Sequence, residues 1–183
     1  DNVSIAPLEK NCNNLLLNGD AEYGDTPSFW THWAVNANGG EEITVVQESA
    51  NNHVFRVSNR QTPADGIHQF VDPRCLVAGQ GMKLVARMKL VLKGTNQGVS
   101  CDPADTRVNF ACPPVRVRPW GQDDREFYMS NRPNWSANGF NQYEVEITVD
   151  NVIANSDRVS VGIRGYNDEW DMLIDDIRLE PVV

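Results

Sequence analysis

The chain has 183 residues, of which 40% are hydrophobic, so its composition is that of a folded globular protein and excludes a disordered or collagen-like polymer. Its longest apolar run, around Leu90, is interrupted by basic residues and is far shorter than the ~20 residues of a membrane-spanning helix. With 25 acidic and 16 basic residues the net charge is −9, which argues against a nucleic-acid partner. We therefore expect neither a membrane nor a nucleic acid as partner.

Alternation of apolar and polar residues with a period of two predicts β-strands along most of the chain. The alternating runs are Val54–Ser58, Lys83–Leu92, Arg107–Phe110, Tyr143–Val149 and Val159–Arg164. Turn-forming segments such as Asn38-Gly39-Gly40 and Ala64-Asp65-Gly66 separate strands. With no alternation of strands and helices, the pattern predicts one all-β domain at residues 14–183, an antiparallel two-sheet β-sandwich of the jelly-roll type, after an N-terminal extension at residues 1–13.

In each alternating run one set of residues is apolar and must face the core. This inward set is Leu84, Ala86, Met88 and Leu90, then Val145, Ile147 and Val149, then Val159, Val161 and Ile163. The outward set is rich in arginine and includes Arg56, Arg60, Arg87, Lys89, Arg116, Arg118 and Arg164. Two interpretations stay open: an ordinary solvated polar face, or a basic sheet face that binds a ligand.

Four cysteines, at positions 12, 75, 101 and 112, and Asn-x-Ser sequons at Asn2 and Asn134 indicate an oxidising compartment and hence secretion. Zinc ligation is the alternative, but the chain lacks the paired Cys-x-x-Cys spacing of zinc sites. Two disulfides are favoured, and three pairings are possible. One of them closes a short loop between Cys101 and Cys112 and ties Cys12 of the N-terminal segment to Cys75.

Paired acids stand beside apolar runs near both ends of the chain. Asp20 and Glu22 follow Leu15-Leu16-Leu17, and Asp175-Asp176 interrupts the run from Leu173 to Leu179. Strict alternation slips at Asp175-Asp176, which predicts a β-bulge or a ligand site there. Acids beside a core need a proton, hydrogen bonds or a cation, and oxygen ligands of this kind suit calcium.

Three segments resemble carbohydrate-binding modules of families four, nine and twenty-two, over residues 14 to 181. They are Asn-Leu-Leu-Leu-Asn-Gly-Asp-Ala-Glu at 14–22, Val-Ser-Asn-Arg-Gln-Thr-Pro-Ala-Asp-Gly-Ile-His-Gln at 57–69, and Leu-Ile-Asp-Asp-Ile-Arg-Leu at 173–179. The resemblance implies a jelly-roll sandwich, a structural calcium near the chain ends and sugar binding on the concave face of one sheet. Polysaccharide is then the expected partner.

The resemblance also implies the metal ligands. Gly19 would offer its backbone carbonyl, Glu22 and Asp176 their carboxylates, and a backbone carbonyl near His53 would complete the shell. The alternative is that these acids cap a turn or are solvated.

The sugar site implied by the resemblance contains Arg60, and Gln69 of the same segment joins it in our prediction. The family usually has an aromatic residue where this chain has Ala64. Because pyranose rings stack on aromatic rings, replacements are expected from Trp120, Phe127 or Tyr128 and from Tyr166 or Trp170. Trp30, Trp33 and Trp135 are assigned to packing.

A cleft lined by Arg60, Arg87, Lys89 and Arg164 would favour an acidic polysaccharide, because guanidinium groups pair bidentately with carboxylate or sulfate. This inference comes from the residues and not from the resemblance. It predicts affinity that falls with added salt.

Two other function classes are alternatives to a sugar-binding module. Carboxylates at Asp123, Asp124, Glu126, Asp168, Glu169 and Asp171 could supply a glycosidase pair, but the chain matches no nucleophile, metalloprotease or phosphate-loop motif, so we expect no catalytic residues. The rival is a structural or adhesive subunit of an extracellular matrix or filament that keeps the fold and has lost sugar binding. A tethered catalytic domain or matrix neighbours are the corresponding protein partners.

Overall fold

The computed structural model describes residues 12–24, 26–32, 41–105, 107, 110–129 and 134–182. The strands are β1 (Thr31–His32), β2 (Glu42–Ser49), β3 (Asn52–Ser58), β4 (Gly66–Val71), β5 (Gly81–Leu92), β6 (Gly98–Val99), β7 (Val115–Pro119), β8 (Arg125–Phe127), β9 (Asn141–Thr148), β10 (Val159–Arg164) and β11 (Trp170–Pro181). Two short helices are η1 (Pro73–Cys75) and α1 (Asn151–Ala154). None of the helices in these ranges is long and apolar enough to cross a membrane. Asn2, Trp33 and residues 1–11 of the predicted extension lie outside the described residues.

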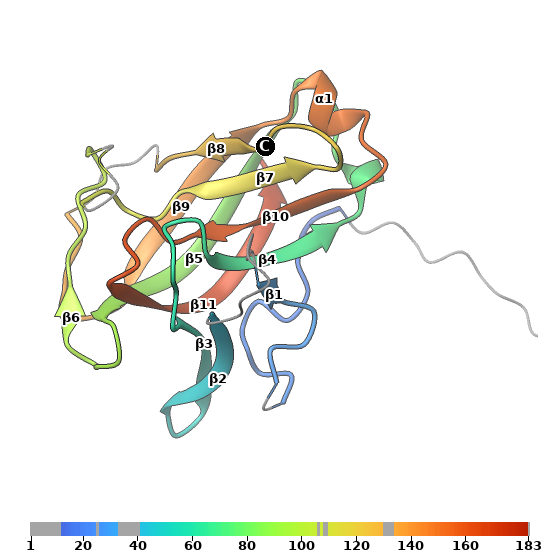
Figure 1. Cartoon of the computed structure of the whole chain (residues 1–183). Helices are drawn as coiled ribbons and strands as arrows, with labels where there is room; N and C mark the ends of the chain where they lie inside the picture. Colours follow the sequence, from blue (N-terminus) through green and yellow to red (C-terminus); the bar gives the residue numbers. More distant parts are fainter. Residues whose placement is uncertain are drawn as a thin grey trace, which may run out of the picture.

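The strands form two antiparallel sheets that pack face to face (Figure 1). A five-stranded sheet has the order β1-β4-β10-β7-β8, and a six-stranded sheet has the order β2-β3-β11-β5-β6 with β9 paired to β5. The predicted all-β sandwich is therefore confirmed. Chain segments cross between the sheets, since β10 belongs to one sheet and the next strand, β11, to the other.

The core between the sheets is built from the predicted inward residues. Leu84 and Met88 of β5 and Val159 and Ile163 of β10 have no exposed surface. Trp30 and Trp135 are also buried, which confirms their assignment to packing. Hydrophobic alternation thus identified the strands that matter most for the core.

The predicted strand Arg107–Phe110 is wrong. The described residues Arg107 and Phe110 belong to a bend and a turn, and the Arg107 carbonyl accepts hydrogen bonds from the backbone N–H groups of Phe110 and Ala111. This turn lies inside the loop closed by a disulfide between Cys101 and Cys112. Alternation over four residues is too short to separate a strand from a constrained loop.

Both disulfides are present, with the predicted local pairing. Cys101 binds Cys112, and Cys12 binds Cys75 at the end of η1. The second bond spans 63 residues and attaches the N-terminal segment to the body of the sandwich.

The predicted irregularity at the acid pair is a β-bulge in β11. Pairing with β5 runs in register from Trp170 to Asp175 and shifts before Arg178. Asp176 has a φ of +52°, in the left-handed region. The Ile177 N–H donates to the Gly19 carbonyl at 2.9 Å, so the bulge also anchors the N-terminal segment.

Strands β4 and β10 approach closely through glycine. A Cβ on Gly162 would lie 2.1 Å from the carbonyl oxygen of Ile67 and 2.6 Å from the Cα of His68. No side chain fits there without movement of backbone, so Gly162 sets the spacing at the centre of the five-stranded sheet.

We expect Gly162→Ala to lower the free energy of unfolding by about 1–3 kcal/mol, because backbone must shift to admit the methyl group. Gly139→Ala is the matched control, since a Cβ there meets nothing within 4 Å. Chemical denaturation of both variants measures the difference. Equal stability of the two would contradict the argument.

Candidate functional site

The predicted basic cleft does not form, because its members lie on two different sheets. Arg87 and Lys89 belong to β5 of the six-stranded sheet, and Arg164 belongs to β10 of the five-stranded sheet. Each points away from the core, so they lie on opposite sides of the sandwich. Alternation predicts which residues face outward but not which sheet a strand joins. Arg87 is bound to the bulge acids, at 3.1 Å from Asp175 and 3.6 Å from Asp176.

Arg60, predicted as the leading sugar ligand, is only 1% exposed. Its Nε donates to the Trp170 carbonyl at 3.0 Å, and its Nη2 donates to the carbonyls of Trp170 and Asn167. Desolvation lowers the pKa of Arg60 against the opposing effect of Glu41 and Asp65, and burial, followed by the charge of Asp65, raises the pKa of Glu41 to about 8. Arg60 therefore holds the loop between β10 and β11 and offers no surface to a sugar.

Gln69 is also turned away from any ligand. It shares the inward side of β4 with Ile67 and Val71 and is 5% exposed. Its side chain donates to the Leu17 carbonyl at 3.0 Å and accepts from the Leu17 N–H at 2.7 Å. This double hydrogen bond fastens the N-terminal segment, so the prediction of a sugar contact at Gln69 is corrected to a structural role.

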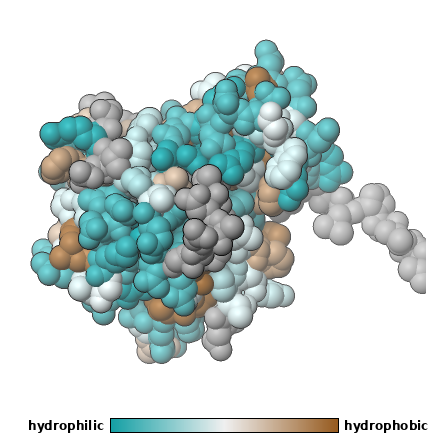
Figure 2. All heavy atoms as spheres, viewed as in Figure 1, coloured by the Kyte–Doolittle hydropathy of each residue, from teal (hydrophilic) through white to brown (hydrophobic). Residues whose placement is uncertain are grey.

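The outer face of the five-stranded sheet carries a cluster of ion pairs that we call the charged network. It consists of Arg116, Arg118, Arg164, Asp124 and Glu126. Arg118 Nε lies 2.7 Å from Asp124 Oδ1, and Arg116 lies 3.2 Å from Asp124 and 3.5 Å from Glu126. Arg164 also pairs with Glu126. In Figure 1 this face is turned towards the viewer, and Figure 2 shows that hydrophilic residues cover most of it.

Two predicted rings extend the charged network. The Tyr128 hydroxyl donates to Glu126 at 3.1 Å and lies 3.0 Å from the Tyr166 hydroxyl. Because a carboxylate only accepts, Tyr128 is the donor to Glu126 and Tyr166 is the donor to Tyr128. Burial, together with the negative charge of Glu126, raises the pKa of Tyr128. Tyr128 is 43% exposed, whereas Tyr166 is 8% exposed, so Tyr128 has the larger surface for a ligand.

The charged network determines the ionisation of its acids. Burial of the Asp124 carboxyl opposes ionisation, but the hydrogen bond from Arg118 and the charges of Arg116, Arg118 and Arg164 outweigh it and lower the pKa of Asp124. Arg118 in turn has a raised pKa through the same hydrogen bond. Asp124 is therefore charged at neutral pH, which does not suit a general acid. Of the other acids weighed for catalysis, Asp171 lies on β11 in the other sheet and binds Arg56 at 2.7 Å.

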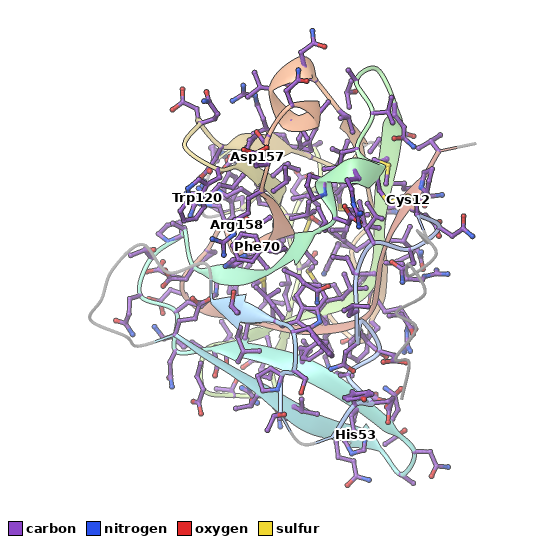
Figure 3. The ribbon with its side chains drawn as sticks, turned by 90° about the vertical axis from the view of Figure 1, so that its right-hand side faces the viewer. Cys12, His53, Phe70, Trp120, Asp157 and Arg158 are labelled. Carbon is purple, nitrogen blue, oxygen red and sulfur yellow. A yellow bond between two sulfur atoms is a disulfide. The ribbon has the colours of Figure 1, made fainter. Side chains whose placement is uncertain are left out.

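A second feature of the same face is a stack of two rings and one guanidinium, which we call the aromatic clamp. It consists of Phe70 at the end of β4, Trp120 just after β7 and Arg158 just before β10. The Arg158 Cζ lies 3.9 Å from the Phe70 ring centroid and 4.7 Å from that of Trp120. Phe70 is 41% and Trp120 is 63% exposed. Figure 3 shows the three side chains together, on the other side of the molecule from Cys12.

The antiparallel strand order explains the aromatic clamp. Strand β10 lies between β4 and β7, and Val159 pairs with both Val71 and Pro119. The ends of β4 and β7 therefore meet the start of β10 at one end of the sheet. The sequence suggested Trp120 but missed Phe70, an outward residue of β4, and Arg158, which comes just before β10. Only the pairing of strands brings the three residues together.

The four predicted calcium ligands fall into two pairs. Gly19 and Asp176 line a cavity of about 240 Å³ together with Asp20 and two asparagines, whose oxygen atoms suit a hard cation, and with the cationic Arg178. Glu22 and His53 instead bind each other, with Glu22 accepting from the His53 N–H at 2.6 Å and lying 3.0 Å from Nδ1. Within the described ranges, no three His, Cys, Asp or Glu side chains group closely enough to hold a metal by themselves. Gly19 and Asp176 are thus the two predicted ligands that share one cavity.

The lowered pKa of Asp124 makes its ion pairs stabilise the fold above the pKa of an unfolded Asp, near 4, and this stabilisation is lost as pH falls through the folded value. We expect Asp124→Asn to lower the free energy of unfolding at pH 7 by roughly 1 kcal/mol, with the difference from the unmodified chain vanishing at low pH. Denaturant unfolding across pH 2–7 measures it. Asp123→Asn, at an exposed neighbour, is the control, and an equal effect of both would refute the role of the network.

No protein-family model and no curated protein matches the chain. Several solved structures are similar to it in fold. A CBM22 xylan-binding domain of Paenibacillus barcinonensis Xyn10C superposes with a TM-score of 0.59 at 13% identity, over 87% of this chain and 89% of that domain. The C-terminal family 22 module of Clostridium thermocellum Xyn10B gives 0.60 at 14%, over 95% and 100%. A putative sugar binding protein of Bacteroides thetaiotaomicron gives 0.63 at 10%, over 92% and 100%. The chain therefore has the fold of family 22 carbohydrate-binding modules, as its sequence motifs predict.

Proposed function

We propose that this chain binds an extracellular polysaccharide, without catalysis, on the outer face of its five-stranded sheet. The observation that carries the proposal is the exposure of Phe70 and Trp120 on that face. Large exposed aromatic rings cost free energy in water unless a partner covers them. The apolar C–H face of a pyranose is such a partner, and the nearby charged network supplies planar groups for its hydroxyls.

The fold and the disulfides support this assignment. The neighbour from Paenibacillus barcinonensis is described as xylan-binding, and its fold matches nearly the whole chain. Two disulfides support an oxidising, extracellular setting, which is where polysaccharides are met. A similar structure from Clostridium thermocellum Xyn10B joins a CBM22 module to a GH10 module. We therefore include in the proposal a catalytic domain tethered to this chain.

The excess of arginines over carboxylates on this face favours acidic glycans as the ligand. Together the charged network and the aromatic clamp contain four arginines and two carboxylates, namely Arg116, Arg118, Arg158 and Arg164 against Asp124 and Glu126. This positive excess stands on a chain whose net charge is −9. Local excess positive charge favours an anionic ligand and makes its binding sensitive to salt.

We also propose a structural calcium in the cavity lined by Gly19 and Asp176. The cavity joins the N-terminal segment to the β11 bulge, so an ion there would cross-link the two ends of the chain. Glu22 and His53 would enter its shell only after giving up their hydrogen bonds to each other.

We expect Trp120→Ala to abolish or weaken glycan binding at least tenfold, because it removes the most exposed ring of the aromatic clamp. Phe110→Ala is a matched control: Phe110 is 52% exposed and lies under Arg107 at 4.5 Å, but on the disulfide loop. A glycan array with calcium, at low and physiological salt, followed by titration of the bound glycans, measures both. Equal losses of glycan affinity in the two variants would contradict a binding site at Trp120. Silence across the array with concentration-dependent self-assembly would favour the structural subunit.

If calcium occupies the cavity, excess chelator should lower the melting temperature by roughly 5–10 °C, and returned calcium should restore it. Thermal unfolding with calcium, with magnesium and with chelator measures this. The Asp176→Asn variant should lose the response to chelator. An unchanged melting temperature in chelator refutes the calcium site while leaving the glycan proposal intact.

A further inference from the structure

Arg158 differs from the other arginines of the outer face in having no carboxylate partner among the described residues. Arg116, Arg118 and Arg164 each pair with Asp124 or Glu126. Within the part of the chain that the structure describes, the guanidinium of Arg158 makes no ion pair or hydrogen bond, and its side chain is exposed. Its backbone carbonyl accepts the Trp120 N–H at 2.9 Å, which fixes the start of its side chain beside the ring.

Two rings hold the guanidinium of Arg158 in place. Phe70 and Trp120 lie within about 5 Å of its Cζ, inside the roughly 6 Å over which a cation attracts an aromatic face. The two rings confine the guanidinium, while its N–H donors form no hydrogen bond within the described residues. Stacking also reduces the rotamer freedom that a free arginine would lose on binding.

A planar fork of N–H donors fits a carboxylate, which it binds through two parallel hydrogen bonds. Trp120 is 63% exposed, and its ring centroid lies 4.7 Å from the Arg158 Cζ. A pyranose stacked on that ring would bring an equatorial carboxylate edge-on to the guanidinium. A uronic acid unit carries both the apolar ring face and the equatorial carboxylate.

We propose that Arg158 recognises the carboxylate of a uronic acid unit whose sugar ring stacks on Trp120. This rests on the proposed polysaccharide binding and names the residue that determines its specificity. The paired arginines of the charged network then bind the remainder of the glycan through hydrogen bonds, with most of their charge already offset by Asp124 and Glu126.

The test measures affinity by calorimetry for glucuronoxylan and for polyglucuronate, each beside its carboxyl-reduced, neutral form. We expect Arg158→Gln to weaken binding of the two acidic polymers about tenfold, the worth of one charge-assisted pair, and to change binding of the neutral forms less than twofold. Arg158→Lys should not restore it, because lysine lacks the planar fork. Arg107→Gln, at the exposed arginine–ring stack of the disulfide loop, is the control and should change the affinity for neither kind of polymer.

Several results would overturn the assignment. One is an equal loss of affinity for acidic and neutral polymers in Arg158→Gln. Another is full affinity for the acidic polymers in Arg158→Lys. The third is Arg158-dependent binding of dextran sulfate that is tighter than binding of either uronate polymer. Failure of the underlying function gives a different result. If the unmodified chain binds no polymer, polysaccharide binding itself fails, whereas Trp120-dependent binding of neutral polymers with no preference for uronates refutes only the role of Arg158.

Discussion

The buried guanidinium of Arg60 is the interaction on which the candidate face depends. It lies where the chain passes between the sheets, and it donates to the Trp170 and Asn167 carbonyls of the loop that joins β10 to β11. A Cβ on Gly165 would lie 1.3 Å from its Nη1, so this loop can pack on Arg60 only through glycine. A buried charge needs partners, and nearby carboxylates, Glu41 foremost, favour the ionised form. Arg60 thereby fixes the strand end that carries Arg164 and Tyr166.

This constraint accounts for the order of the outer face. With β10 held at its end and spaced from β4 by Gly162, the outward side chains of β7 and β10 stand at fixed distances. Arg116 and Arg164 can then share Glu126 without the loss of side-chain entropy that weakens most surface ion pairs. A network ordered before the ligand arrives loses less freedom on binding than mobile side chains would.

The sequence predicted what depends on local pattern and failed on what depends on strand pairing. The inward residues of β5 and β10 and the bulge at Asp175 follow from counting positions along one strand, and all were predicted. The sheet to which a strand belongs is decided by partners far along the chain, and so the grouping of Arg87 with Arg164 was wrong. Arg60 was misassigned for a related reason: the alternating pattern ends before it, and nothing local distinguishes a buried arginine from an outward one. Phe70 was missed because its neighbours Trp120 and Arg158 are distant in sequence.

Two exposed rings of this face, Phe70 and Trp120, stand at the opposite end of β4 from Ala64, the position where the resembled families carry an aromatic residue. Ala64 comes just before β4 begins, whereas Phe70 lies near its end. At about 3.3 Å per residue, the two positions are roughly 20 Å apart along the strand direction. The charged network extends along the outer face from the register of Phe70, which Arg118 faces across β10, past that of His68, which Arg116 faces in the same way. A chain-like ligand lying along β10 would therefore meet Phe70, Trp120 and Arg158 at one end, the ion pairs of the charged network along its length, and Tyr128 with Tyr166 at the other end. Such a face has a direction, and a polymer whose charge sits at one position along its repeat could bind it in only one orientation.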